Sequence, residues 1–449
     1  MRTVALAVAG LVWCGSVYAQ LPNGKPVSNP IPAQTGEPGT LPGGTEISRP
    51  LTPVEVPPAG PPPVEKPPPV VPDETPAKPV KIEKVRSHGP LGPRWDTDDL
   101  LLWWSKSHPL PTLVTGTRTG AAPILGGPDT QVLVGPGSLG NQVVAGGRFV
   151  RGWSLNPEQT VGIEFAYFFL GSRTADVTIP SVGSRFTTIG LPYTDAYTGR
   201  PDAITIAAPN GRQSYLTVGA TSRVQGFEAN FLANLFAVEH AKLHFVGGYR
   251  YFQLNEGLRI EQTYIEAPPY RDSTMIARAA DQFDTANRFS GGQLGLQADF
   301  DRGPLFVEMT GKVAFGQNTE VVRIGGETHT VTAAAGTGLV ASRSFQYGMY
   351  AQPSNTARVT NAAFAVVPEG TFKLGLKTSD RSRFYAAYNF MYLSDAVRPG
   401  DQVDRVLSAS QVPILTGVRP GAWADRPVAS VNRTDFWVHG VVIGWEGRY

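Results

Sequence analysis

The chain has 449 residues, of which only 17% are charged, and its formal net charge is +2. A balance so close to neutral gives no electrostatic basis for a nucleic-acid partner, which needs a basic patch or stripe. Aromatic residues make up 10%, and Gly (50) and Pro (40) are both well above their usual share. The length suits two or three ordinary domains, or one large β-domain with long loops.

Residues 1–19 are predicted to form a cleaved signal peptide. Arg2 supplies a positive charge, Val4 to Val12 form an apolar run, and Val17-Tyr18-Ala19 places small residues before the expected cleavage site. The run is far shorter than the ~20 residues of a membrane-spanning helix, which argues against an anchor. The only cysteine, Cys14, lies in this segment behind a bulky tryptophan. We therefore expect no lipidation, and no disulfide or thiolate site in the mature chain.

Residues 20–94 are predicted to form a disordered, proline-rich leader. Between residues 21 and 90, 20 of 70 residues are proline, and seven basic residues balance seven acidic ones. Runs such as Pro61-Pro62-Pro63 fix φ and remove backbone donors, which excludes helix and sheet. Such a segment samples polyproline II and stays solvated. We expect a flexible periplasmic tether; the alternative is a contact with the cell wall or a periplasmic protein.

From residue 95 onward the sequence alternates with period 2, the signature of β-strands. In residues 161–169 the odd positions are all large and apolar. Similar alternation recurs in segments of about ten to fifteen residues, whereas soluble strands usually have about five or six and tilted membrane strands about nine to eleven. The predicted strands lie near 97–105, 145–156, 159–170, 222–236, 241–254, 287–300, 304–315, 364–377, 383–394 and 434–447.

The spacing of these strands predicts their topology. Connections of a few residues alternate with connections of roughly 30 to 50 residues. Bacterial barrels have an even number of strands, short periplasmic turns and long external loops. We therefore predict an all-β fold, an antiparallel up-and-down transmembrane β-barrel of ten strands in the bacterial outer membrane, with five long loops outside. Twelve strands are the alternative if a long loop hides a hairpin of 319–324 with 338–346.

Charged residues on the polar face of the strands are candidate lumen residues. They could line a pore or fill the lumen with ion pairs. An eight-stranded barrel is just filled by side chains and aqueous channels appear near sixteen strands, so ten strands favour ion pairs. The candidates are Glu164, Glu228, Lys242, Arg250, Glu308, Lys312, Lys373 and Arg383.

Two further sites are predicted near the C-terminus. The loop after the ninth strand carries Arg398, Asp401 and Asp404, which predict a salt-bridged turn; a ligand site is the alternative. The last strand alternates up to a terminal aromatic residue. Its Trp445 and Tyr449 look like the signal that the barrel-assembly machinery reads.

Motifs for chemistry are weak. The segment Gly135–Gly140 fits G-x-G-x-x-G, but it leads into a strand, whereas a dinucleotide site must open a helix. The six histidines are scattered and form no cluster with metal-ligand spacing. His439 and Asp435 share the last strand, yet no G-x-S-x-G elbow accompanies them. We expect no enzyme activity, no cofactor and no metal.

A set of short motifs runs through the strand region: Leu101–Trp104 with His108–Pro111, Ile124–Gly126, Gly162–Glu164 with Tyr167–Leu170, Asn287–Gly295, Gly311–Gly316, Val366–Gly370, and Tyr392–Ser394 with Arg398–Asp404. As a set they resemble the putative beta-barrel porin type-seven family of bacterial outer-membrane proteins, from about Trp95 to Tyr449. The resemblance implies an outer-membrane barrel and, through the family's label, porin-like passage of small solutes. It implies no catalytic residues.

Two functions stay open on the sequence. One is porin-like passive passage of small solutes; the other is a non-conducting surface barrel whose long external loops bind partners or coat the cell. The expected partners are outer-membrane lipid and, during biogenesis, the barrel-assembly machinery. No nucleic-acid partner is expected.

Overall fold

The computed structural model describes residues 92–139, 142–209, 211–267, 273–334, 340–413 and 425–449. The predicted signal peptide and all but the last three residues of the predicted leader lie outside these residues. Among the described residues, no helix is long and apolar enough to cross a membrane. The described helical segments η1 (Pro399–Gln402) and η2 (Ala409–Gln411) are short 3₁₀ turns.

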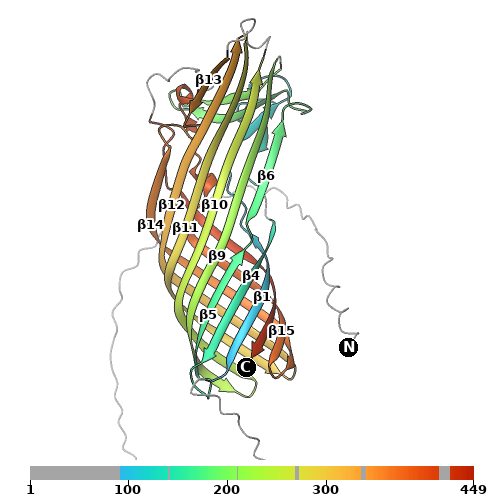
Figure 1. Cartoon of the computed structure of the whole chain (residues 1–449), viewed down its shortest axis with the longest axis vertical. Helices are drawn as coiled ribbons and strands as arrows, with labels where there is room; N and C mark the ends of the chain where they lie inside the picture. The colour runs from blue at the N-terminus through green and yellow to red at the C-terminus, as the bar shows by residue number, and fades with distance from the viewer. Residues whose placement is uncertain (1–91, 140–141, 210, 268–272, 335–339, 414–424) are drawn as a thin grey trace, which may run out of the picture. The chain divides into compact units, whose positions relative to one another are not determined.

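Ten strands form a ring in which each pairs antiparallel with the next ring strand along the chain, and β17 pairs with β1 to close it (Figure 1). The order confirms the predicted up-and-down barrel of ten strands. The ring strands are β1 (Arg94–Ser105), β4 (Val143–Ser154), β5 (Val161–Leu170), β9 (Arg212–Val238), β10 (Ala241–Glu266), β11 (Ser273–Arg302), β12 (Leu305–Ala334), β14 (Ala357–Ser379), β15 (Ser382–Val397) and β17 (Arg433–Arg448).

The ring has two unlike ends. At one end the strands are joined by the short connections 155–160, 239–240, 303–304 and 380–381, and the first and last strands meet where the Arg94 N–H donates to the Tyr449 carbonyl at 3.2 Å. We call this the turn end and the opposite one the loop end. Gly303 has a φ of 61°, the left-handed conformation that a tight turn requires and that glycine adopts without strain.

Four ring strands are far longer than predicted. β9, β10, β11 and β12 have 27, 26, 30 and 30 residues, and they continue past the loop end of the other strands (Figure 1). We call this part the extended wall: residues 212–225, 253–266, 273–288 and 317–334. Two strands widen it, because β6 (Arg173–Pro180) pairs with β9 and β13 (Val340–Phe345) pairs with β12.

The twelve-stranded alternative is not formed. Residues 319–324 belong to β12 and pair with β14, while β13 pairs with residues 328–333 of the same β12. Both segments extend the wall and add no strand to the ring. The third predicted long loop, 255–286, likewise lies mostly in the hairpin of β10 and β11.

The other connections at the loop end fold into a cap, formed by residues 106–139, 181–209, 346–356 and 398–413. It contains a second sheet in the order β16-β7-β2-β3, with β8 beside β7. Its apolar side chains, such as Leu191 and Tyr350, form one buried cluster with Leu258 and Phe283 on the inner face of the wall. The strands of this sheet are β2 (Val114–Thr117), β3 (Gln131–Val134), β7 (Thr188–Asp195), β8 (Pro201–Ala207) and β16 (Val406–Leu407).

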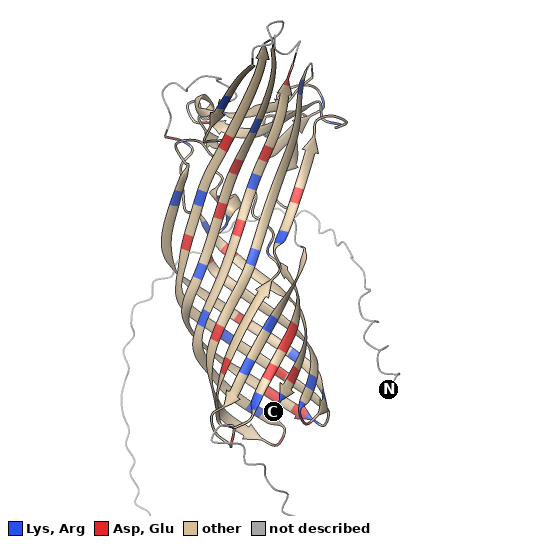
Figure 2. Cartoon of the chain, viewed as in Figure 1, with Lys and Arg blue, Asp and Glu red and all other residues tan. Residues whose placement is uncertain are grey.

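An apolar band surrounds the ring on its outer face. Phe227, Tyr249, Leu294, Met309 and Phe372 are examples of its exposed side chains. Beyond the band, most outward positions of the extended wall are polar or charged, with Ile265, Ile276 and Val331 as exposed apolar exceptions. Acidic and basic residues follow the wall strands toward the loop end (Figure 2). The band is where a bilayer would contact the protein, because only there does the outer face lack charge.

Candidate functional site

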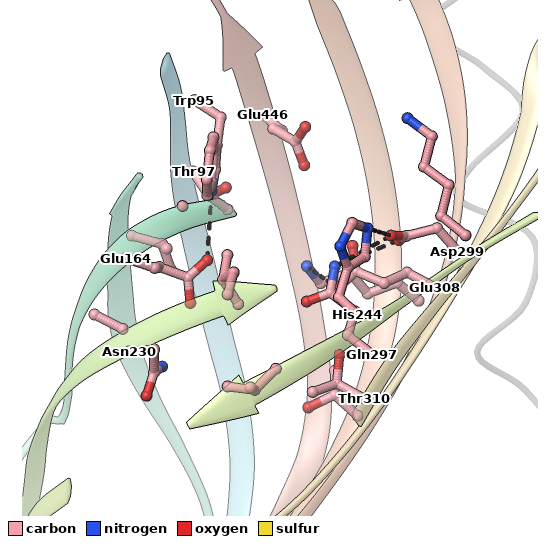
Figure 3. Close-up of a pocket in the computed structure, with 18 of the residues that line it drawn as sticks. Trp95, Thr97, Glu164, Asn230, His244, Gln297, Asp299, Glu308, Thr310 and Glu446 are labelled. Atoms are coloured by element: carbon pink, nitrogen blue, oxygen red, sulfur yellow. Dashed lines mark hydrogen bonds and ion pairs between the residues drawn. The ribbon is translucent and has the colours of Figure 1, made fainter. Parts of the chain in front are cut away.

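The lumen holds a polar cavity that opens at the turn end. It holds about 1500 Å³ of empty space, including the open solvent at its mouth, and inward-facing side chains of the ring strands line it. Figure 3 shows Trp95 and Glu164 on one side and His244, Asp299 and Glu308 on the other. The lining includes these predicted lumen residues: Glu164, Glu228, Lys242, Glu308, Lys312, Lys373 and Arg383. Arg250, the remaining predicted residue, is 1% exposed and lies in the ionic layer between this cavity and the loop end.

An ionic layer closes this cavity toward the loop end. Arg250 on β10 contacts Glu228 on β9 at 2.5 Å and also pairs with Glu369 on β14. Lys312 on β12 lies 2.7 Å from Glu228 and 3.2 Å from Glu369. Two cations and two carboxylates from four strands thus meet across the lumen. Such buried pairs are costly to open, because a separated partner remains as an uncompensated charge.

Further hydrogen-bonded and ionic pairs line the lumen around this layer. Arg148 donates to Asp99 at 2.7 Å, and Tyr385 donates to the same carboxylate. Lys373 lies 2.7 Å from Glu308, whereas Arg383 reaches Glu446 only at 3.9 Å. The predicted lumen residues are therefore mostly paired with one another or with carboxylates on adjacent strands.

The network includes residues that the sequence argument did not select, notably Glu369 and Arg148. Both lie in predicted strands, and Glu369 is four residues from Lys373, so the period of two places them on one face. That signal could have identified Glu369. Its pairing with Arg250 on β10 depends on ring closure, which sequence spacing does not show.

An apolar layer fills the lumen beyond the ionic layer. Its rings are in contact, with centroids 5.7 Å apart for Trp103 and Phe168, 6.3 Å for Phe168 and Phe252, and 6.5 Å for Phe252 and Phe436. Phe289 and several aliphatic side chains complete the same buried cluster. The side chains are at most 6% exposed, so this layer is packed like a protein core rather than hydrated like a channel.

Arg398 and Glu256 form a buried pair above the apolar layer, where the cap meets the wall. Arg398 donates from Nε and Nη2 to the two Glu256 oxygens at 2.8 and 2.7 Å, and from Nη1 to the Ser107 carbonyl at 2.8 Å. The cap residue His108 lies 3.5 Å from Glu256, and burial lowers the pKa of its imidazole to about 4. The pair ties two cap segments to β10.

The three charged residues predicted for this loop have separate partners. Arg398 binds Glu256, whereas Asp404 pairs with Arg426 at 2.9 Å and accepts from the Val428 N–H at 3.0 Å. Asp401 accepts from Asn432 through its main-chain carbonyl at 2.8 Å. The structure places the three as anchors along one loop and does not bring them together in one site.

Tyr350 lies at the centre of the cap. Its hydroxyl donates to the Leu113 carbonyl at 3.1 Å and contacts the Pro192 carbonyl at 3.3 Å, which belong to two other cap segments. The Asp281 carboxylate on β11 accepts from the backbone N–H groups of Tyr350 and Ala351 at 2.9 and 2.7 Å. The cap is thus hydrogen-bonded within itself and to the wall.

The two residues of the predicted assembly signal lie at the turn end. Trp445 donates from Nε1 to Ser382 at 2.8 Å, and the ring of Tyr449 lies 4.6 Å below the Arg94 guanidinium. Among the described residues, no group of three or more His, Cys, Asp or Glu side chains is arranged to hold a metal ion.

Two solved structures of outer-membrane proteins resemble the chain at low identity. The outer membrane protease OmpT from Escherichia coli has a TM-score of 0.38 at 8% identity, over 80% of this chain and 97% of its own. A Pseudomonas aeruginosa FadL homologue has a TM-score of 0.21 at 9% identity, over 80% and 90%. At scores this low, neither supports an argument about this chain. A comparison with curated proteins gives no match.

A family model matches residues 95–449, which include the whole ring, the extended wall and the cap. The match confirms the resemblance inferred from the motifs between Trp95 and Tyr449. It also fits the closed ring of ten strands and its outward apolar band. The chain belongs to the family described as "Putative beta barrel porin-7" and is a bacterial outer-membrane β-barrel.

Proposed function

We propose that this protein is a non-conducting outer-membrane barrel that displays a folded cap at the cell surface. The observation that carries the proposal is the filled lumen: the ionic layer around Arg250, the aromatic layer around Phe252 and the Arg398–Glu256 pair follow one another. A solute would have to displace each of them. Separating one partner of a buried ion pair typically costs about 3–5 kcal/mol, and several pairs would have to open together.

In the proposed orientation, the turn end lies in the periplasm and the loop end lies outside the cell. Short turns at the inner rim and large structures at the outer rim are the usual arrangement of bacterial barrels. The polar outer face of the extended wall supports this orientation, since charged side chains there would be solvated above the bilayer. Partner binding or surface coating would then be a property of the cap and the wall.

Porin-like passage of small solutes is the second candidate. The family description favours it, and so does the solvent-open cavity at the turn end, which could form the inner half of a pathway. Passage would require the ionic and aromatic layers to move aside. A ten-stranded barrel leaves little room for that, because barrels become open channels near sixteen strands.

Single-channel recording of the refolded barrel in a planar bilayer tests the proposal. We expect no discrete conductance from the wild type. A double variant that empties the aromatic layer, Trp103→Ala with Phe252→Ala, should also stay silent once heat-modifiable mobility shows that it is folded, because the ionic layer and the Arg398–Glu256 pair remain. Reproducible steps from the wild type would overturn the proposal in favour of passage.

Cysteine labelling tests the orientation separately. The sequence has a single cysteine, Cys14, which lies in the predicted signal peptide. We expect Ser342→Cys on β13 to react with a membrane-impermeant maleimide in intact cells. Arg381→Cys in a short turn should react only after the outer membrane is permeabilised. The reverse pattern would place the cap in the periplasm.

A further inference from the structure

A second basic residue is buried beside the Arg398–Glu256 pair. Arg173 starts β6, and the strand register puts it opposite Ser222, which lies opposite Glu256. Arg173 is 5% exposed, Glu256 is 4% exposed and Arg398 is fully buried. Together with His108 of the cap, they form a polar cluster just above the apolar band of the barrel, where β6, β10 and two cap segments converge.

The charges in this cluster do not balance. Arg398 donates to both oxygens of Glu256, so the single negative charge of that carboxylate is already balanced by one guanidinium. Arg173 has no ion pair among the described residues; its Nη1 donates to Ser105 Oγ at 2.8 Å. Its Nε and Nη2 are buried and have no acceptor, and neither His108 ring nitrogen has a hydrogen-bond partner in the described part of the chain.

This excess positive charge cannot be removed by deprotonation. A guanidinium stays protonated in proteins, and burying a charge without a partner is strongly unfavourable. His108 offers no compensation, because an imidazole carries no negative charge; burial, together with the charges of Arg398 and Arg173, keeps its pKa low. Burial lowers the pKa of Arg173, while the Glu256 charge raises it and the Arg398 charge lowers it, so the two guanidiniums share one carboxylate. A water molecule could accept hydrogen bonds from the unpaired N–H groups, but it would leave the positive charge of Arg173 uncompensated.

We infer that Arg173, beside His108 and Arg398, binds a small anion of the halide or simple carboxylate class. The anion would accept from Arg173 Nε and Nη2 and neutralise the cluster. It would sit between the wall and the cap segments that carry His108 and Arg398, so its binding would stabilise the docked cap. The site is distinct from the turn-end cavity. Of its residues, only Arg398 belongs to the loop for which the sequence predicted a salt-bridged turn or, as the alternative, a ligand site.

The experiment compares anions at constant ionic strength. Refolded full-length barrel is unfolded thermally in rising sodium chloride and in sodium gluconate, whose six-carbon polyol makes it too bulky for a small-anion site. Hydrogen exchange is followed in residues 105–113 and 398–412. Since a ligand that binds only the folded state stabilises it by mass action, we expect a saturating rise of roughly 2–4 °C in midpoint. Slower exchange in both segments should accompany it. A midpoint that does not depend on the anion would overturn the inference.

Variants locate the site. Arg173→Gln should abolish the chloride effect, whereas Arg259→Gln, an exposed arginine on the outer face of the same wall, should leave it unchanged. If Arg173→Gln does not fold, Arg173→Lys keeps the charge with a different donor geometry and should at least halve the effect. A full chloride effect in whichever Arg173 variant folds would contradict the inference. Formate in place of chloride then distinguishes a carboxylate site from a halide site.

Discussion

The two halves of β9–β12 have opposite polarity. In the half that belongs to the ring, outward residues such as Phe227 and Phe245 are apolar, and inward residues such as Glu228 and Arg250 are charged. In the extended wall the outward face is mostly polar, and the inward face carries a large apolar core beside buried polar residues such as Asp281. On β10, Arg259 and Glu261 face outward, while Leu258 and Ile260 are fully buried against the cap.

This difference shows that each face follows its surroundings rather than the strand. A strand keeps its alternation of sides along its whole length. In the ring, the outside meets lipid and the inside is a narrow polar lumen. In the wall, the outside meets water and the inside is covered by the cap. The switch lies near Gln225, Gln253, Arg288 and Gln317 on the four strands.

The largest effect is expected from removing a side chain from the buried apolar core between the extended wall and the cap. Phe283→Ala removes a fully buried ring from that core, and a Phe to Ala change in a core typically costs about 3–5 kcal/mol. Hydrogen exchange should rise in cap residues 186–193 while the ring strands stay protected. Asp284→Ala, on the opposite face, should change stability by no more than about 0.5 kcal/mol. Equal effects of the two variants would contradict the face assignment.

A charge on the apolar band should have the next largest effect. Met309 lies between Ala298 and Phe372 in the register, near the middle of the outward apolar positions of β12. Met309→Arg should therefore destabilise the barrel by about 2–4 kcal/mol in a bilayer. The matched control is Thr319→Arg, on the same strand and face but in the wall, and its effect should stay within about 0.5 kcal/mol. Urea unfolding in lipid vesicles measures both; similar losses would argue against a band boundary between them.

The smallest effect is expected from Tyr350→Phe, a variant that tests whether the cap segments unfold as one unit. Tyr350→Phe removes the hydroxyl that joins two other cap segments, and a buried hydrogen bond contributes about 1 kcal/mol. Exchange should rise at residues 112–115 and 190–194. Tyr215→Phe, at an exposed position on the outer face of the wall, is the control. Unchanged exchange in Tyr350→Phe would mean that the segments dock independently.

Much of the ring could be predicted from the sequence. Alternation and spacing gave the ten strands, their order and the inward face of Lys312 and Lys373. The predicted strands nevertheless ended near residues 222, 254, 287 and 315, close to where outward residues turn polar. Beyond these residues most outward side chains are no longer apolar, so the alternation that marks a membrane strand is lost, although the strands continue.

The sequence by itself determined the period of two, the short turns and the apolar band, because these depend on neighbours close in the chain. Only the tertiary structure decided which charges meet, since Arg250 and Glu369 are 119 residues apart and come together through ring closure. The core of the cap likewise forms only in the tertiary structure. Its short strands bury few residues alone, and they become a core only where the extended wall gives their apolar side chains a surface to pack against.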